Sequence, residues 1–157
     1  MKIELKSVHV NARFSRETTC YQAILVVDGV PVAHAENDGG GGSDHYRAME
    51  GKRDLLDAAY AYAKTLPPLK SDYFPDGLPM DLELLVGQLL SAAAVEKRFD
   101  ALTKKYALES ADGKVWQYKA PKGRTVAEVV AALVAKGKVI LNAMPRDEAL
   151  AVFKAAA

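Results

Sequence analysis

The stretch NDGGGGSDHY, residues 37–46, holds the densest group of side chains in the chain that could carry chemistry. Four consecutive glycines lie between Asp38 and Asp44, and His45 follows. A glycine-rich segment before a helix can hold phosphate, because its backbone N–H groups point at the anion. A P-loop also needs a lysine and a hydroxyl directly after the last glycine, and two aspartates would repel phosphate. The pattern therefore favours a flexible loop between a strand and a helix, with glycines that give backbone freedom.

A metal site is the second chemical interpretation of this region. His34, Asp38, Asp44 and His45 offer the imidazole and carboxylate ligands that zinc or non-haem iron accepts. Their spacing is irregular, and His9 is equally well placed to lie beside His34 across a sheet. We therefore expect no metal and no cofactor.

Nucleophilic and acid–base catalysis find no support in the residue pattern. Cys20 is the one cysteine, and no sequence feature supplies the cationic neighbour that a reactive thiolate needs. No G-x-S-x-G stretch presents a serine nucleophile. Acidic pairs such as Asp81 with Glu83, or Asp147 with Glu148, are typical of helix starts. The sequence predicts a non-enzymatic protein with no catalytic residue.

Basic and aromatic side chains alternate between residues 104 and 124. Such a pattern can hold single-stranded nucleic acid by stacking and phosphate contact. The other interpretation, which we favour, is a hairpin whose aromatics pack inward and whose lysines keep it soluble. The candidate nucleic-acid residues are Lys104, Lys105, Lys114, Trp116, Tyr118, Lys119, Lys122 and Arg124.

Composition limits the class of protein. The 157 residues are 50% hydrophobic and 26% charged, with a net charge of +1, which is enough for one domain with a core. This charge balance gives no general attraction to nucleic acid or anionic membranes. A single cysteine forms no internal disulfide, and the N-terminus shows no signal-peptide pattern. The longest apolar run, LELLVGQLLSAAAV, is too short to span a bilayer, so we expect a soluble, cytoplasmic protein.

The N-terminal region reads as a β-meander. Asp28-Gly29 between two β-rich runs is typical of a type I′ hairpin turn that pairs Val27 with Val30. Pro31 suits an edge strand over 30–36, and residues 2–10 form a first strand with a bulge near Ser7. The predicted inward face comprises Tyr21, Ala23, Leu25, Val27, Val30, Val32 and His34.

The remaining elements give an α+β fold. We predict a three-stranded antiparallel meander packed on two long helices, followed by a small ββαβα C-terminal part. The helices are expected over 44–65, capped by Ser43, over 80–106, over 125–137 and from Pro145 onward. A hairpin is expected over 106–120, and a short strand or extended segment over 138–142. The chain is expected to form one domain, 1–157, and the proline-rich connector 67–79 is where it would divide.

Three stretches carry a resemblance to a known family. They are NARFSRETTCYQAILVVDG, the glycine-rich NDGGGGSDHY, and LELLVGQLL followed by KRFDALTKKY, and together they cover most of residues 8–106. In these the chain resembles a family of small uncharacterised proteins encoded by phages and plasmids; the C-terminal part matches it only loosely. Members of that family often carry a histidine in the glycine loop, where this chain has Gly40 or Gly41. That departure argues against a metal or catalytic role for the loop.

The resemblance implies a mobile-element accessory protein in the host cytoplasm that acts by binding. Its expected partner is a host protein or ribonucleoprotein defence complex, which it would inhibit as anti-CRISPR proteins do. No binding to a membrane is expected. An exposed edge strand at 30–36 beside the glycine loop would supply the contact. The expected partner-binding residues are Val30, Val32, His34, Glu36, Asp38, Gly40, Gly41, Asp44 and His45. The alternatives are a nucleic-acid-binding factor that uses 104–124 and a small metal-dependent enzyme at the glycine loop.

Overall fold

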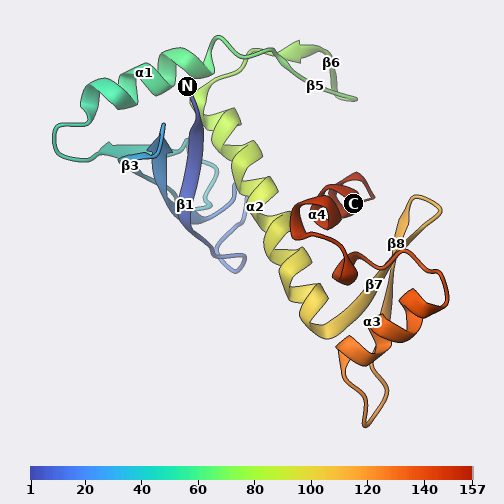
Figure 1. The fold of residues 1–157 in the computed structure, drawn as a ribbon. Coiled ribbons are helices and arrows are strands. Elements are labelled where there is room, and N and C mark those ends of the chain that lie inside the picture. The colour runs from blue at the N-terminus through green and yellow to red at the C-terminus, as the bar shows by residue number, and fades with distance from the viewer. Residues whose placement is uncertain (157) are drawn as a thin grey trace. The chain divides into compact units, whose positions relative to one another are not determined.

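The computed structural model describes residues 1–156 and has mixed α+β structure, with helices and antiparallel sheets (Figure 1). The chain forms two compact units, Met1–Ser91 and one that begins at Ala92. The division falls inside helix α2 (Leu82–Lys105) and not in the connector 67–79. Each unit has its own core; the expectation that the two make one domain stays a prediction.

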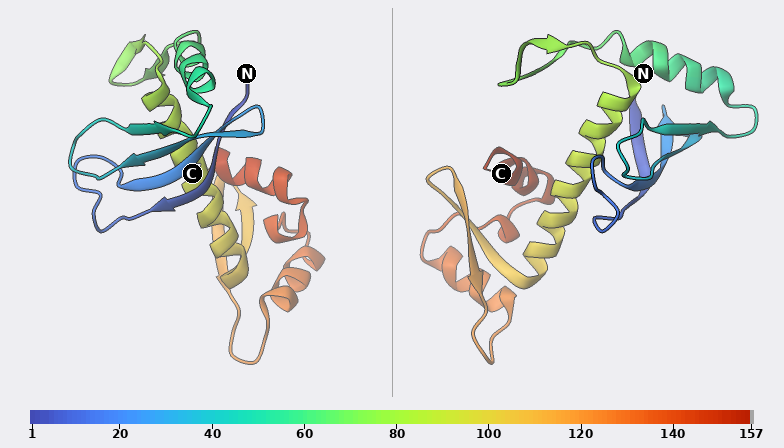
Figure 2. Two further views of the ribbon diagram at one scale, coloured as in Figure 1. Left: turned by 90° about the vertical axis from the view of Figure 1, so that its left-hand side faces the viewer. Right: turned by 180° about the vertical axis from the view of Figure 1, so that it is seen from behind.

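A four-stranded antiparallel sheet organises the first unit, in the order β1-β2-β3-β4 (Figure 2). The Asp28-Gly29 turn is confirmed, with both residues at positive φ, 47° and 83°. The bulge in the first strand is confirmed as well, because Ser7 has φ 51° and the register shifts between Lys6 and His9. The strands are β1 (Ile3–Val10), β2 (Tyr21–Val27), β3 (Val30–Asn37) and β4 (His45–Ala48).

The predicted helix over 44–65 is wrong in its first part. Residues 45–48 pair with β3 as strand β4, and helix α1 begins only at Arg53 and ends at Ala63. Gly51 adopts a left-handed φ of 66°, which interrupts a right-handed helix. Since β3 has β2 on one side and β4 on the other, the prediction of an exposed edge at 30–36 is also wrong.

A bulge after the hairpin turn changes the predicted register. Val27 pairs with Val30 as expected, but Leu25 pairs with Ala33, which leaves Val32 as the extra residue. Beyond the bulge every β3 side chain is on the face opposite to the one predicted. His34 is therefore exposed on the outer face, and the prediction that it points inward is wrong.

Two helices cover the inner face of this sheet and close the first core. Leu56, Ala59 and Ala63 of α1 recur at helical spacing and are all buried. The first turns of α2 pack into the same core, which also contains the fully buried Leu25. Burying one such leucine stabilises the unit by about 1.5–3 kcal/mol. The connector 67–79 forms a short hairpin of β5 (Leu69–Ser71) and β6 (Phe74–Leu78).

The second unit packs around the later turns of α2. Its predicted hairpin is confirmed as β7 (Tyr106–Ala111) and β8 (Lys114–Lys119), and α3 (Val126–Ala135) and α4 (Arg146–Ala155) match the last two predicted helices. No full strand forms over 138–142: Ile140 is extended and makes one bridge to Glu109, and a 3-10 turn, η1 (Leu141–Ala143), follows. The core residues are Phe99, Leu108, Leu141, Ala149, Leu150 and Phe153.

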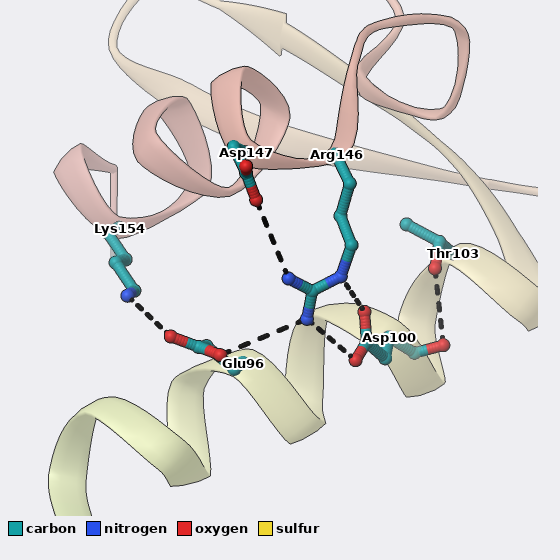
Figure 3. A network of polar contacts seen from close by, with 6 residues as sticks. All are labelled: Glu96, Asp100, Thr103, Arg146, Asp147 and Lys154. Atoms are coloured by element: carbon teal, nitrogen blue, oxygen red, sulfur yellow. Dashed lines mark hydrogen bonds and ion pairs between the residues drawn. The ribbon is translucent and has the colours of Figure 1, made fainter. Parts of the chain in front are cut away.

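Ion pairs join α4 to α2 within this unit (Figure 3). Arg146 binds Asp100 with two parallel hydrogen bonds, Nε–Oδ1 at 3.2 Å and Nη2–Oδ2 at 3.0 Å, and Lys154 Nζ lies 3.0 Å from Glu96 Oε1. The bond from Arg146 holds the pKa of Asp100 below its ordinary value. These contacts fix α4 over the shared core of Phe99 and Phe153.

Candidate recognition face of the N-terminal sheet

The outer face of the four-stranded sheet gathers all three histidines of the chain. Side chains alternate between the two faces of a strand, so the register determines which residues share the outer face. One row crosses all four strands through His9, Gln22, Glu36 and His45. The next row consists of Lys6, Ile24, His34 and Arg47. Every member of the two rows except the half-buried Ile24 is exposed.

Two adjoining grooves hollow this face. The larger, about 660 Å³, extends from His9 and His45 to the loops at the end of the sheet, where Cys20 and Asp38 line it. The smaller, about 330 Å³, is lined by His34 and Arg47 among others. Both grooves share His9, Gln22 and Glu36. The outer face is thus concave and presents imidazole, amide, carboxylate and guanidinium groups.

The glycine loop is folded tightly against residues 11–20. The Gly39 carbonyl accepts hydrogen bonds from the N–H groups of Arg16 and Glu17, at 3.0 and 3.1 Å. A Cβ on Gly39, at φ 84°, would lie 2.2 Å from the Phe14 carbonyl oxygen, which leaves no room for a side chain. A Cβ on Gly41, at φ 95°, would lie 2.3 Å from Glu17 Oε2. The loop joins two strands instead of a strand and a helix, and its glycines permit close approach to the protein's own backbone.

Asp44 is the centre of a polar network on the inner face of the sheet, next to the glycine loop. Its carboxylate accepts hydrogen bonds from the hydroxyls of Tyr21 (2.6 Å) and Tyr46 (2.8 Å) and from Asn37 Nδ2 (3.0 Å). Burial is the main cause that raises the pKa of both tyrosines; the Asp44 carboxylate comes next for Tyr21, and Tyr21 followed by Asp44 for Tyr46, since ionisation would add negative charge beside them. Asn37 Nδ2 also donates to the Gly42 carbonyl at 2.9 Å, which ties the loop to the network.

The structure separates the predicted partner-binding residues into three groups. His34, Glu36 and His45 lie on the outer face, as two rows of the register require. The exposed residues at the turn and in the loop are Val30, Asp38, Gly40 and Gly41. Val32 is fully buried and Asp44 is bound inside the network, so neither side chain is free to contact a partner.

The predicted binding residues omit four exposed members of the outer face: Lys6, His9, Gln22 and Arg47. His9 belongs to the outer face only because the bulge at Ser7 shifts the register of β1. Arg47 falls in the predicted helix 44–65; the alternation of polar and apolar residues in HYRA, 45–48, is a strand signal, but it covers only four residues.

The ligands proposed for a metal site do not converge. Asp44 and His45 are adjacent in sequence, so they point to opposite faces of the sheet: Asp44 binds Tyr21 on the inner face, whereas His45 is exposed on the outer face. Among residues 1–156, no three or more His, Cys, Asp or Glu side chains are grouped so that they could hold a metal ion.

The basic–aromatic segment lies in the second unit, and its aromatics differ in exposure. Tyr106 packs against the core, and the Tyr118 hydroxyl donates to Glu109 at 2.5 Å. Trp116, by contrast, is 53% exposed. Lys138 Nζ lies 2.7 Å from Glu109 and 5.2 Å from the centre of the Tyr118 ring, so the inner part of this hairpin is a closed network.

Charge is divided unequally between the units. Residues 92–157 hold 12 lysines and arginines against 7 acids, a net charge of +5, whereas residues 1–91 hold 9 against 13, a net charge of −4. The near-neutral charge of the whole chain therefore conceals a basic C-terminal unit and an acidic N-terminal one.

Comparison of the chain with protein-family models, with curated proteins and with solved structures gave no match. Within residues 1–156, no helix has both the length and the apolar character needed to cross a membrane. The fold and the site define an α+β protein with a hollowed, polar outer sheet face.

Proposed function

We propose that this protein is a mobile-element accessory protein that acts by non-enzymatic binding, as an inhibitor of a bacterial defence complex such as CRISPR-Cas. The observation that carries the proposal is the outer sheet face, on which the three histidines of the chain share two rows with Gln22 and Arg47. The resemblance of residues 8–106 to phage and plasmid proteins supplies the biological setting.

The outer face suits recognition of another protein. Its imidazole, amide and guanidinium groups can donate hydrogen bonds to a partner, and Glu36, in the row with His9 and His45, can accept them. Neighbouring side chains within a row lie about 4.8 Å apart, the spacing of adjacent strands, so each row presents a close series of groups to a partner. The two adjoining grooves would let side chains of a partner enter the face. The contacts that these side chains make would then be buried and shielded from water.

The inner network keeps this face in shape before binding. Hydrogen bonds among Asp44, Tyr21 and Asn37 join β2, β3 and the glycine loop, beside the end of the row that contains His45. A surface that is already ordered loses less conformational entropy when a partner docks. Because β3 is paired on both sides, a partner would bind through side chains of the face and not by adding a strand at 30–36.

A CRISPR interference assay tests the proposal. Cells that carry an active CRISPR-Cas system and this protein should accept a targeted plasmid that cells without it reject. Arg47→Glu reverses a charge on the outer face, and we expect it to abolish that protection. Lys70→Glu is the matched control, since it makes the same charge change at an exposed position in β5. If both variants protect as well as the unmodified protein, the outer face is not the inhibitory surface.

A second candidate function is the binding of single-stranded nucleic acid by the second unit. The exposed Trp116 on a unit of net charge +5 favours it, since an aromatic face next to lysines can stack on a base while the lysines contact phosphate. Affinity for an oligonucleotide should then fall steeply with salt, and Lys119→Glu with Arg124→Glu should abolish it. Binding that is insensitive to salt would end this interpretation.

A further inference from the structure

Helix α3 is apolar but lies at the surface. Of its ten residues, VAEVVAALVA, only Glu128 is polar, and that side chain is used in the capping box with Thr125. All ten residues are described by the structure, and none of them is buried. An apolar helix normally packs inside a protein or against a partner. The exposure of α3, with Val134 at 45%, therefore needs an explanation.

A groove of about 500 Å³ runs along this helix, and its walls are apolar. Val126, Val130 and Val134 form one side, and Ala143 contributes to the other. The two polar residues in the lining, Thr103 and Asn142, already have hydrogen-bond partners within the unit.

Asn142 in particular leaves no free polar group for a ligand in the groove. Its Nδ2 donates to the carbonyls of Thr103 and Tyr106, both at 3.0 Å, and its Oδ1 accepts from the Leu108 N–H at 2.8 Å. The groove therefore offers apolar contact and shape, without a hydrogen bond to read a small polar ligand.

Basic residues flank the groove along the chain at three places. Lys104 follows the groove-lining Thr103, Arg124 and Lys122 precede the start of α3, and Lys136 follows its last residue. All four are exposed. They belong to the unit with net charge +5, so the segments that line the apolar groove are bordered along the chain by positive charge.

We propose that this groove docks an amphipathic helix of another protein, one whose apolar stripe is bordered by acidic residues. The apolar side chains would enter between the valines of α3, and the acids would meet Lys104, Lys122 and Lys136. Helix-in-groove recognition of this kind combines apolar burial with complementary charge. This surface is independent of the outer sheet face and of the function proposed for it.

Charge argues against the other two occupants of such a groove. A second copy of this chain, related by a two-fold axis, would bring the same basic flanks against each other, which is repulsive. An anionic membrane would match the charge, but the exposed side of α3 carries alanines where an interfacial helix inserts large apolar and aromatic side chains.

Two synthetic peptides test the proposal against the full-length protein by fluorescence anisotropy. Both form an amphipathic helix with the same leucine stripe, one bordered by glutamate and the other by lysine. The glutamate peptide should bind saturably and more weakly at high salt, and the lysine peptide should not bind. Equal affinity for both peptides, or no binding of either, overturns the proposal.

Matched variants locate the binding on the groove. Ala131→Glu places a carboxylate in the groove lining and should weaken binding of the glutamate peptide at least about 10-fold, whereas Ala132→Glu, exposed on the same helix outside the lining, should change it less than about 2-fold. Both positions are exposed, so both variants should fold. The double reversal Lys122→Glu with Lys136→Glu should transfer the preference to the lysine peptide, and an unchanged preference counts against the proposal.

Two further arms identify the other occupants. Sedimentation with vesicles of phosphatidylcholine and phosphatidylglycerol that Ala131→Glu abolishes would assign the groove to a membrane. A concentration-dependent rise in mass by light scattering that the same variant abolishes would assign it to a second copy. Either result overturns the proposal; the expected result is a monomer that stays in the supernatant.

Discussion

Replacement of Gly39 by alanine tests whether the glycine loop owes its shape to close packing against its own chain. A methyl group there would lie 2.2 Å from the Phe14 carbonyl oxygen and 2.9 Å from Cys20 Cβ. Because Phe14 presents backbone atoms, the clash is relieved only if the loop or residues 11–20 move. Movement breaks the bonds that the Gly39 carbonyl accepts from Arg16 and Glu17.

The magnitude follows from these contacts. An alanine at the observed φ of 84° is strained by about 1 kcal/mol. The two shorter hydrogen bonds to the Gly39 carbonyl, from Arg16 and Glu17, contribute about 1 kcal/mol each, and the long one from the Thr18 N–H, at 3.5 Å, adds little. We therefore expect Gly39→Ala to lower the free energy of unfolding by about 3 kcal/mol, measured by urea denaturation with an unchanged slope.

Two neighbouring glycines provide matched comparisons. Gly41→Ala is strained at φ 95°, but its clash is with the end of the flexible Glu17 side chain, so we expect a loss of only about 1 kcal/mol. Gly42 has an ordinary φ and nothing within 4 Å of an added Cβ, so Gly42→Ala should be neutral or stabilising within about 0.5 kcal/mol. Equal losses at Gly39 and Gly42 would refute the reasoning and mean that the loop does not pack as described.

Three further predictions concern the ionisable groups. Asp44→Asn replaces charged acceptors of two tyrosine hydroxyls by a neutral amide and should lower the free energy of unfolding by about 2–3 kcal/mol; a loss below about 0.5 kcal/mol in urea denaturation contradicts the network. The pKa values of Tyr21 and Tyr46 are raised above 10.0, so the stability that the network contributes is complete below pH 10.0 and declines above it, because the unfolded chain releases protons that the folded chain retains. Tyr21→Phe should make the urea midpoint fall less steeply with pH in this alkaline range. An unchanged dependence of the midpoint on pH counts against the prediction. The pKa of Asp100 is lowered by Arg146, so this contact stabilises the fold fully above pH 3.8 and is lost as pH falls through the folded value; Arg146→Gln should raise the Asp100 titration midpoint in carboxyl NMR, and an unmoved midpoint means that the pair does not form in solution.

The local turn and cap signals of the sequence were sufficient to predict much of the fold. Asp28-Gly29 and Asp112-Gly113 form hairpin turns because both residues of each pair adopt positive φ. Thr125 caps α3 through the expected bond from the Glu128 N–H at 3.3 Å. These features depend on a few adjacent residues, so they can be read without tertiary information.

The strand β4 could not be predicted in the same way. HYRA is a four-residue strand after a long loop, and its pairing with β3 depends on where the Val32 bulge places the register. A helix was favoured because the apolar residues after Arg53 are helical in period and Ser43 is a good cap in isolation. Gly51, which lies between β4 and α1 and adopts a left-handed φ, is the residue that argues against a continuous helix.

The candidate site could be predicted only in part, because it too depends on the register of β3. His34, Glu36 and His45 are predicted as binding residues because they lie on the expected edge strand or next to the glycine loop, but the face they share follows only from the register on both sides of β3. The predicted inward orientation of His34 failed because one extra residue, Val32, turns every later side chain to the other face. The amide of Asn142 has all its hydrogen bonds satisfied within the unit, which leaves the α3 groove apolar. These bonds join residues more than thirty positions apart, so no local sequence pattern predicts them.

Differential affinity capture tests the central claim, that the outer sheet face binds a host defence complex. The unmodified protein, Arg47→Glu and the control Lys70→Glu would each be used as bait in lysate from cells with an active CRISPR-Cas system, and captured proteins quantified by mass spectrometry. Subunits of the defence complex should be retained in equal amount by the unmodified protein and by Lys70→Glu, and lost with Arg47→Glu. Equal recovery with all three baits, or no defence subunit with any of them, would contradict the claim.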